Sequence, residues 1–181
     1  MSGGLFFGSV IDALIFRAFA VWTAGDLAAL LHGGYYMDSK DIAHNIGYCG
    51  LVCSLCHEAD VCGGCKSDSN CCGRHMSEEG CFQFDCCVNK GLNGCWECTE
   101  SPCDRDMFSE HHDIRNRTFV KIAKMEGIEM LAEYVAKNQK NGIFYGWNRD
   151  YDHLESEEAV IDLLHNGLNS PYVSVKRPLY L

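Results

Sequence analysis

The stretch YCGLVCSLCHEADVCGGC, residues 48–65, opens a block that holds every cysteine of this 181-residue chain. All thirteen cysteines lie between Cys49 and Cys103. A C-x2-C unit occurs three times, at Cys53/Cys56, Cys62/Cys65 and Cys95/Cys98. Two such turns can close a tetrahedral zinc site. The spacing therefore indicates metal sites built from thiolates.

Large apolar residues are sparse between residues 49 and 104, and Gly, Ser and Asp are frequent. Burial alone cannot offset the entropy of ordering such a segment, so crosslinks are expected. A structural zinc ion supplies about 10–16 kcal/mol of coupled folding free energy, whereas a disulfide supplies about 2–5 kcal/mol. Thirteen is an odd number and no export signal is evident, so metal is favoured over disulfides.

The residues Gly47–Cys56, Cys62-Gly-Gly-Cys65, Cys81, Cys86 and Gly94–Cys103 resemble a widespread prokaryotic family of cysteine-rich proteins. That family is known as a domain of unknown function and is presumed to bind zinc. The resemblance runs from about Ile46 to about Asp106 and implies a metal but no activity.

The family pattern implies ten metal-ligand candidates. They are Cys49, Cys53, Cys56, Cys62, Cys65, Cys81, Cys86, Cys95, Cys98 and Cys103. Ten sulfurs suit two Cys₄ sites with two left over, or a site in which His57 or His75 replaces one sulfur. Cys71, Cys72 and Cys87 lie outside the pattern. Spacing does not decide which cysteines share a site.

The chain carries a formal net charge of −10. Residues 37–104 hold 11 acidic and 4 basic side chains, a net −7, so the acidic excess coincides with the cysteines. Negative charge repels phosphate backbones, and no nucleic-acid partner is expected. The same charge attracts cations, which makes metal ions the expected partners.

Residues 1–36 form an apolar N-terminal extension. Within it, Asp12 and Arg17 interrupt the apolar stretch 5–24, so a membrane span or a secretory signal is disfavoured. The extension is expected to be an amphipathic helix packed on the protein, or to be absent from the functional protein.

Apolar spacing and capping residues predict helices that start at Asp113, Ile128 and Ser156 and end near Gly127, Asn141 and Gly167. The aromatic segment 143–151 between them is expected to be extended and to fill the space between helices. We therefore expect a small, irregular α+β protein, with a zinc-ribbon-like metal-binding region over residues 37–104 and a mainly helical region over residues 105–181.

These features favour a cytoplasmic protein with structural, cysteine-ligated Zn²⁺ that binds a protein partner. An iron–sulfur redox protein and a thiolate protein that stores or delivers metal are the alternatives. No phosphate-binding loop, nucleophile elbow or HExxH pattern occurs, no catalytic residue is assigned, and the sequence does not decide whether the chain is an enzyme.

Overall fold

The structure is a computed structural model that describes residues 36–109, 113–146 and 149–173. The expectations for the N-terminal extension, for Trp147 and for the end of the chain after Val173 lie outside these residues. Described residues from Met37 onward belong to one compact unit.

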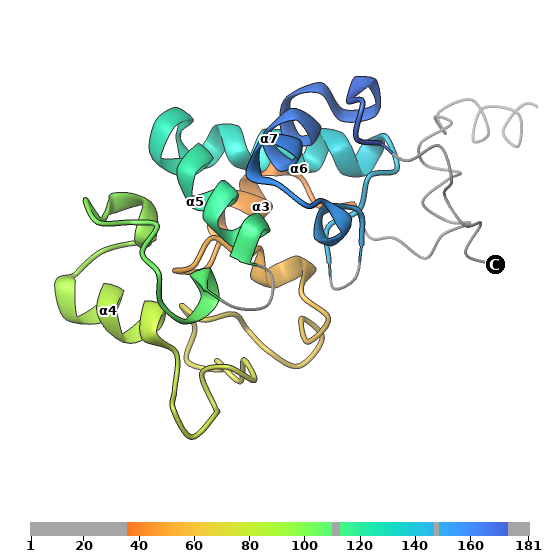
Figure 1. Ribbon diagram of the computed structural model, residues 1–181. Helices are drawn as coiled ribbons and strands as arrows, with labels where there is room; N and C mark the ends of the chain where they lie inside the picture. Colours follow the sequence, from red (N-terminus) through yellow and green to blue (C-terminus); the bar gives the residue numbers. More distant parts are fainter. Residues whose placement is uncertain (1–35, 110–112, 147–148, 174–181) are drawn as a thin grey trace, which may run out of the picture. The chain divides into compact units, whose positions relative to one another are not determined.

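Five α-helices and five short 3₁₀ turns make up the regular structure of the described residues (Figure 1). The helices are α3 (Ser39–His44), α4 (Phe82–Lys90), α5 (Asp113–Glu126), α6 (Ile128–Lys140) and α7 (Glu157–Asn166). The 3₁₀ turns are Cys53–Leu55, Cys95–Glu97, Asp106–Phe108, Asp150–His153 and Gly167–Asn169.

The three helices expected after residue 112 are confirmed. The side chain of Ser156 accepts a hydrogen bond from the N–H of Ala159 at 3.2 Å and so caps α7. Gly127 separates α5 from α6 with φ +97, a left-handed conformation that favours glycine.

The expected α+β class is wrong. Helices account for 51% of the described residues, and no strand or sheet occurs among them. The nearest approach to a sheet is an isolated antiparallel bridge between Ile46 and Val52. The described part of the aromatic segment pairs with no strand, and the side chains of Ile143, Tyr145 and Tyr151 are buried in the core.

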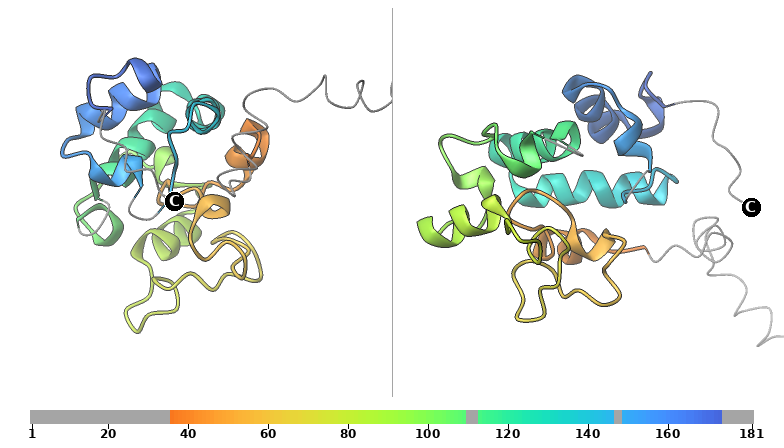
Figure 2. Two further views of the ribbon diagram at one scale, coloured as in Figure 1. Left: turned by 90° about the vertical axis from the view of Figure 1, so that its right-hand side faces the viewer. Right: turned by 60° about the horizontal axis from the view of Figure 1, so that its bottom comes forward.

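One hydrophobic core joins the start of the described chain to the helices. Helix α6 packs against α3, α5 and α7 (Figure 2). From the cysteine-rich side the core receives Ile42, Ile46 and Val52. Helices α5 to α7 contribute Phe119, Ile122, Ala123, Leu131, Ala132, Val135, Ala136, Val160, Leu163 and Leu164. The folding of the two regions is therefore coupled.

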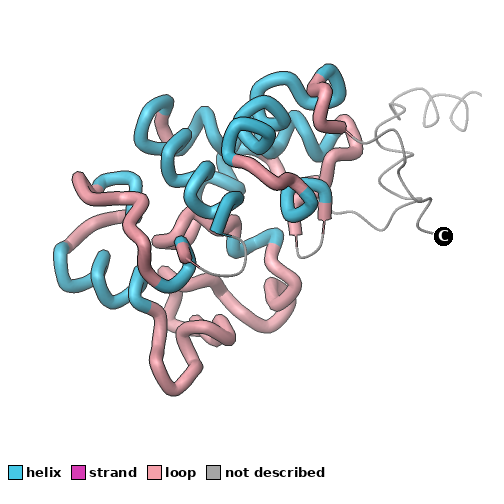
Figure 3. Tube along the Cα trace, viewed as in Figure 1, coloured by secondary structure: helices cyan, strands magenta, loops and turns pink. Residues whose placement is uncertain are grey.

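Most of the loop structure lies around α4, in the cysteine-rich part of the chain (Figure 3). Two basic side chains of α5 hold the last of these loops by its carbonyl oxygens. The Lys124 ammonium donates to the carbonyl of Cys98 at 2.9 Å, and the Arg117 guanidinium donates to that of Cys103 at 3.1 Å. A helix of the core thus fixes a cysteine loop.

In the part of the chain that the structure describes, no helix has both the length and the apolar character that a membrane crossing needs.

Candidate metal centre

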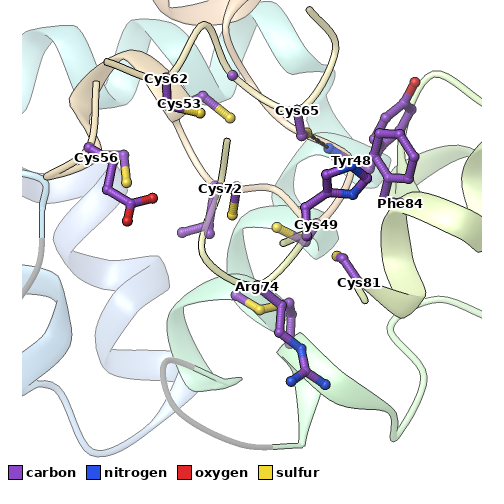
Figure 4. A pocket seen from close by; sticks show the side chains of 15 residues that line it. Tyr48, Cys49, Cys53, Cys56, Cys62, Cys65, Cys72, Arg74, Cys81 and Phe84 are labelled. Carbon is purple, nitrogen blue, oxygen red and sulfur yellow. Dashed lines mark hydrogen bonds between the residues drawn. The ribbon is translucent and has the colours of Figure 1, made fainter. Parts of the chain in front are cut away.

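Seven cysteine side chains surround one cavity of about 60 Å³ (Figure 4). They come from the loops before α4 and from the residue that precedes it. These cysteines are Cys49, Cys53, Cys56, Cys62, Cys65, Cys72 and Cys81. We call them the pocket group.

Two glycines make room for the sulfurs of Cys53 and Cys65 in the pocket group. A Cβ atom at Gly47 would lie 2.7 Å from the Sγ of Cys65 and 3.0 Å from that of Cys53. A Cβ atom at Gly64, which has φ +87, would lie 3.0 Å from the Cβ of Cys53. Only residues without a side chain fit here, so Gly47 and Gly64 form a cradle for two sulfur atoms.

Backbone amides point at several of these sulfurs. The N–H of Tyr48 donates to the Sγ of Cys65, and the N–H of Cys71 donates to the Sγ of Cys62, both at 3.3 Å. Such donors favour a negatively charged sulfur. The local turns thus already supply part of the surroundings that a metal-bound thiolate needs.

Burial and hydrogen bonding both shift the pKa values of these thiols. Burial raises the pKa of Cys49, Cys56 and Cys81 above the ordinary range. The hydrogen bond from the Cys65 thiol lowers the pKa of Cys53 to about 6, and the same contact raises the pKa of Cys65. The contact therefore favours a thiolate on Cys53 and a protonated thiol on Cys65.

Lys66 places a positive charge beside this pair. Its ammonium lies 5.4 Å from the ring centroid of Tyr48 and 4.9 Å from that of Trp96. Burial lowers the pKa of Lys66, while the nearby sulfurs of Cys65 and Cys53 raise it. This charge contributes to the lowered pKa of Cys53.

A second set of sulfurs, which we call the α4 group, lies between α4 and the loop that follows it. Its members are Cys86, Cys87, Cys95, Cys98 and Cys103. The Sγ atoms of Cys87 and Cys95 are 3.6 Å apart, and both residues are buried. The ammonium of Lys90 lies 3.9 Å from the Sγ of Cys98. The pKa of Lys90 is raised by the nearby sulfurs of Cys86 and Cys98.

Helix α4 is held in place by a residue far along the chain. Asp106 accepts a hydrogen bond from the N–H of Phe82 at 2.8 Å and so satisfies a free donor at the start of α4. Its other oxygen lies 2.7 Å from the Nε of Arg74, a residue that lines the cavity. One carboxylate therefore links the start of α4 to the rim of the cavity.

The structure places the candidate ligands in two sets. Cys53 contacts Cys65 from the next C-x2-C unit. The three cysteines that the family pattern leaves out also lie among the sulfurs: Cys72 lines the cavity, Cys71 contacts Cys62, and Cys87 contacts Cys95. Their adjacency to other cysteines was the only sequence signal for this placement.

The two candidate histidines differ in their surroundings. His75 lines the cavity and stacks on Phe84 at a centroid distance of 4.3 Å. The side chain of His57 is 60% exposed, with its Nδ1 atom 3.7 Å from the Sγ of Cys56.

All thirteen cysteines are free thiols and none is in a disulfide. Within the described ranges, no three His, Cys, Asp or Glu side chains form a cluster that could hold a metal ion as they stand. The structure thus gathers sulfur donors around a cavity and beside α4, with close contacts between pairs.

Comparisons with protein-family models, with curated proteins and with solved structures find no match to this chain.

Proposed function

We propose that this protein binds Zn²⁺ through cysteine thiolates, and that the bound metal stabilises the loops between residues 47 and 104. The observation that carries the proposal is the pocket group, seven thiols around one cavity. Soft thiolate sulfur is a preferred zinc ligand.

The surroundings of the sulfurs fit such an ion. Gly47 has no side chain, which leaves room for the sulfurs of Cys53 and Cys65. Backbone amides also donate hydrogen bonds to the sulfurs of Cys65 and Cys62. Lys66 offsets part of the charge that deprotonated cysteines bring. The resemblance of the cysteine pattern to a family presumed to bind zinc points the same way.

The residues that would hold metal fall into two sets. The pocket group offers more than four sulfurs, and the α4 group offers five. Binding requires the thiols of each set to turn toward a common point and to lose their protons. Bound zinc supplies a crosslink between loops, which is the stabilisation that this segment lacks from apolar burial.

Thirteen free thiols suit a reducing compartment, so we place the protein in the cytoplasm. The proposal is for structural metal, because each set offers at least the four protein ligands that close a structural zinc site.

Elemental analysis after anaerobic purification tests the proposal. We expect about two zinc ions per chain, one for each sulfur set. The double variants Cys53→Ser/Cys65→Ser and Cys87→Ser/Cys95→Ser are matched controls for each other, and each should lose one ion while keeping the other. A chain without stoichiometric metal contradicts the proposal, and iron with acid-labile sulfide identifies an iron–sulfur protein instead.

A further inference from the structure

Cys71 is the one thiol of the thirteen that is exposed, and it lies directly against a member of the pocket group. Its backbone N–H donates to the Cys62 sulfur at 3.3 Å, and its thiol donates to the carbonyl of Val61 at 3.5 Å. The two thiols also interact with each other. Cys62 itself lines the cavity. The two sulfurs therefore form a continuous path from solvent to the cavity.

The loop around Cys71 is fixed rather than loosely placed. The side chain of Asn70 accepts a hydrogen bond from the N–H of Cys72 at 3.1 Å, and Glu58 accepts one from the N–H of Gly73 at 3.2 Å. Cys72 and Glu58 both line the cavity. The loop thus holds Cys71 at the rim.

One acidic side chain lies close to the exposed thiol. The carboxylate of Glu58 lies beside the loop, where it accepts the N–H of Gly73, two residues after Cys71. A carboxylate beside an exposed thiol attracts a dissolved cation. Once the thiol proton leaves, the thiolate and the carboxylate together compensate the charge of the cation.

We propose that the Cys62–Cys71 pair is an exchange site for Zn²⁺. An entering ion binds this pair before it reaches the other sulfurs of the pocket group, and a leaving ion binds it last. The proposal rests on the zinc binding proposed above. During uptake, the Cys71 thiol gives its proton to solvent as its sulfur forms a bond to the ion. Cys62, which already contacts Cys71, gives its own proton to solvent and binds the same ion. When further cavity sulfurs bind, the bond to Cys71 breaks and Cys71 recovers a proton from solvent.

This role explains a cysteine that the metal-site pattern does not require. A resident ligand stabilises the bound ion, whereas an exchange ligand lowers the barrier for its entry and exit and leaves the final affinity nearly unchanged. Cys71 is exposed and outside the ten-residue pattern, which suits the second role.

The experiment measures rates with the full-length chain. Metal-free protein is mixed anaerobically with Zn²⁺ held by a weak coloured chelator, and the transfer of zinc is followed by stopped-flow absorbance in both directions. Cys71→Ser should slow uptake and release severalfold while the final zinc content stays that of the wild type. Cys71→His should restore the rates, because imidazole is also a zinc ligand.

Asp68→Asn is the matched control, since it removes an exposed charge from the same loop but no sulfur. It should leave the rates close to those of the wild type. Unchanged rates in Cys71→Ser overturn the exchange role, and so does a lost zinc ion, which would make Cys71 a resident ligand. A wild-type chain that takes up no zinc refutes the proposed function itself.

Discussion

The backbone N–H of Val52 donates a hydrogen bond at 3.0 Å to the hydroxyl oxygen of Tyr145, and both residues are buried. The residue next to Cys53 is therefore anchored to the aromatic segment that follows α6. Without this bond the Val52 amide would have to be buried with no partner.

Replacing Tyr145 with Phe tests that anchor. The variant keeps the ring in the core but removes the acceptor, and an unsatisfied buried amide costs about 1–3 kcal/mol. We expect the free energy of unfolding, measured by urea denaturation at fixed metal content, to fall by that amount. Tyr172→Phe removes a hydroxyl from a 48%-exposed side chain and should change little. Equal values for the two variants would show that the bond contributes nothing.

The cradle of the Cys53–Cys65 pair predicts a specific effect of Gly47→Ala. The new methyl group would meet the Cys65 sulfur at 2.7 Å, so the sulfur or the backbone must shift. Overpacking of this kind costs about 1–3 kcal/mol of folding free energy. The variant should also lose the zinc ion that we assign to the pocket group. Gly73→Ala is the control, because its Cβ atom would meet only the Glu58 carboxylate, at an ordinary 3.6 Å. Metal analysis and thermal unfolding of both variants give the comparison.

The Cys53–Cys65 contact predicts a dependence on pH. Since the pKa of Cys53 is lowered to about 6, its sulfur is a thiolate above that pH and a thiol below it. In metal-free protein at neutral pH, iodoacetamide should label Cys53 faster than Cys56, whose pKa burial raises. Mass spectrometry of labelled peptides over a pH series measures each midpoint.

Lys66 should shift that midpoint. Because the Lys66 charge lowers the pKa of Cys53, Lys66→Met should move the labelling midpoint of Cys53 to higher pH. Lys90→Met removes an equal charge beside Cys86 and Cys98 and should leave Cys53 unaffected. The interpretation fails if the Lys66 variant titrates like the wild type.

A buried ion pair in the core can be compared with an exposed one. Arg115 and Asp152 lie 2.6 Å apart with side chains only 4% and 7% exposed. Asp152→Asn leaves the guanidinium without its counter-charge and should cost about 3–5 kcal/mol.

In the matched variant, Asp104→Asn, the carboxylate that is lost is 93% exposed and pairs with Arg117 at 3.0 Å. Such a pair is worth at most about 1 kcal/mol. Urea denaturation of both variants checks the contrast, and similar losses would contradict the role assigned to burial.

The helices that the sequence predicts correctly have local signals. Helix α7 begins after the capping residue Ser156 with two acidic residues in its first turn, and it ends at Gly167. Gly127 ends α5 in the same way. These features involve neighbours in the chain, so they can be read without the fold.

Helix α4 carries a clear local signal only at its end, where Gly91 follows it with φ +65; no capping side chain marks its start. Its buried residues are Gln83 and Cys87, which give no apolar periodicity. Its first amide is satisfied by Asp106, and the side chain of Gln83 donates to the carbonyl of Arg105 at 2.8 Å. A helix stabilised by partners more than twenty residues away is not visible in local sequence.

The wrong α+β prediction and the undecided arrangement of the sulfurs have the same cause. Spacing marks Cys53 and Cys56 as one C-x2-C unit, but it does not show that the turn at Gly64 brings Cys65 against Cys53. Likewise Val52 bonds to Tyr145 rather than to a neighbouring strand. Both contacts depend on the path of the loops through space, which residue spacing does not encode.

The core residues Ile42, Ile46 and Val52 pack with side chains of α5 and α6. A fragment that starts after Asp104 would leave Phe119 and Leu131 facing water and would be prone to aggregate. A fragment that ends at Asp104 would lose Lys124 and Arg117, whose side chains donate hydrogen bonds to its final loop. Deletion studies should therefore retain both regions on one polypeptide.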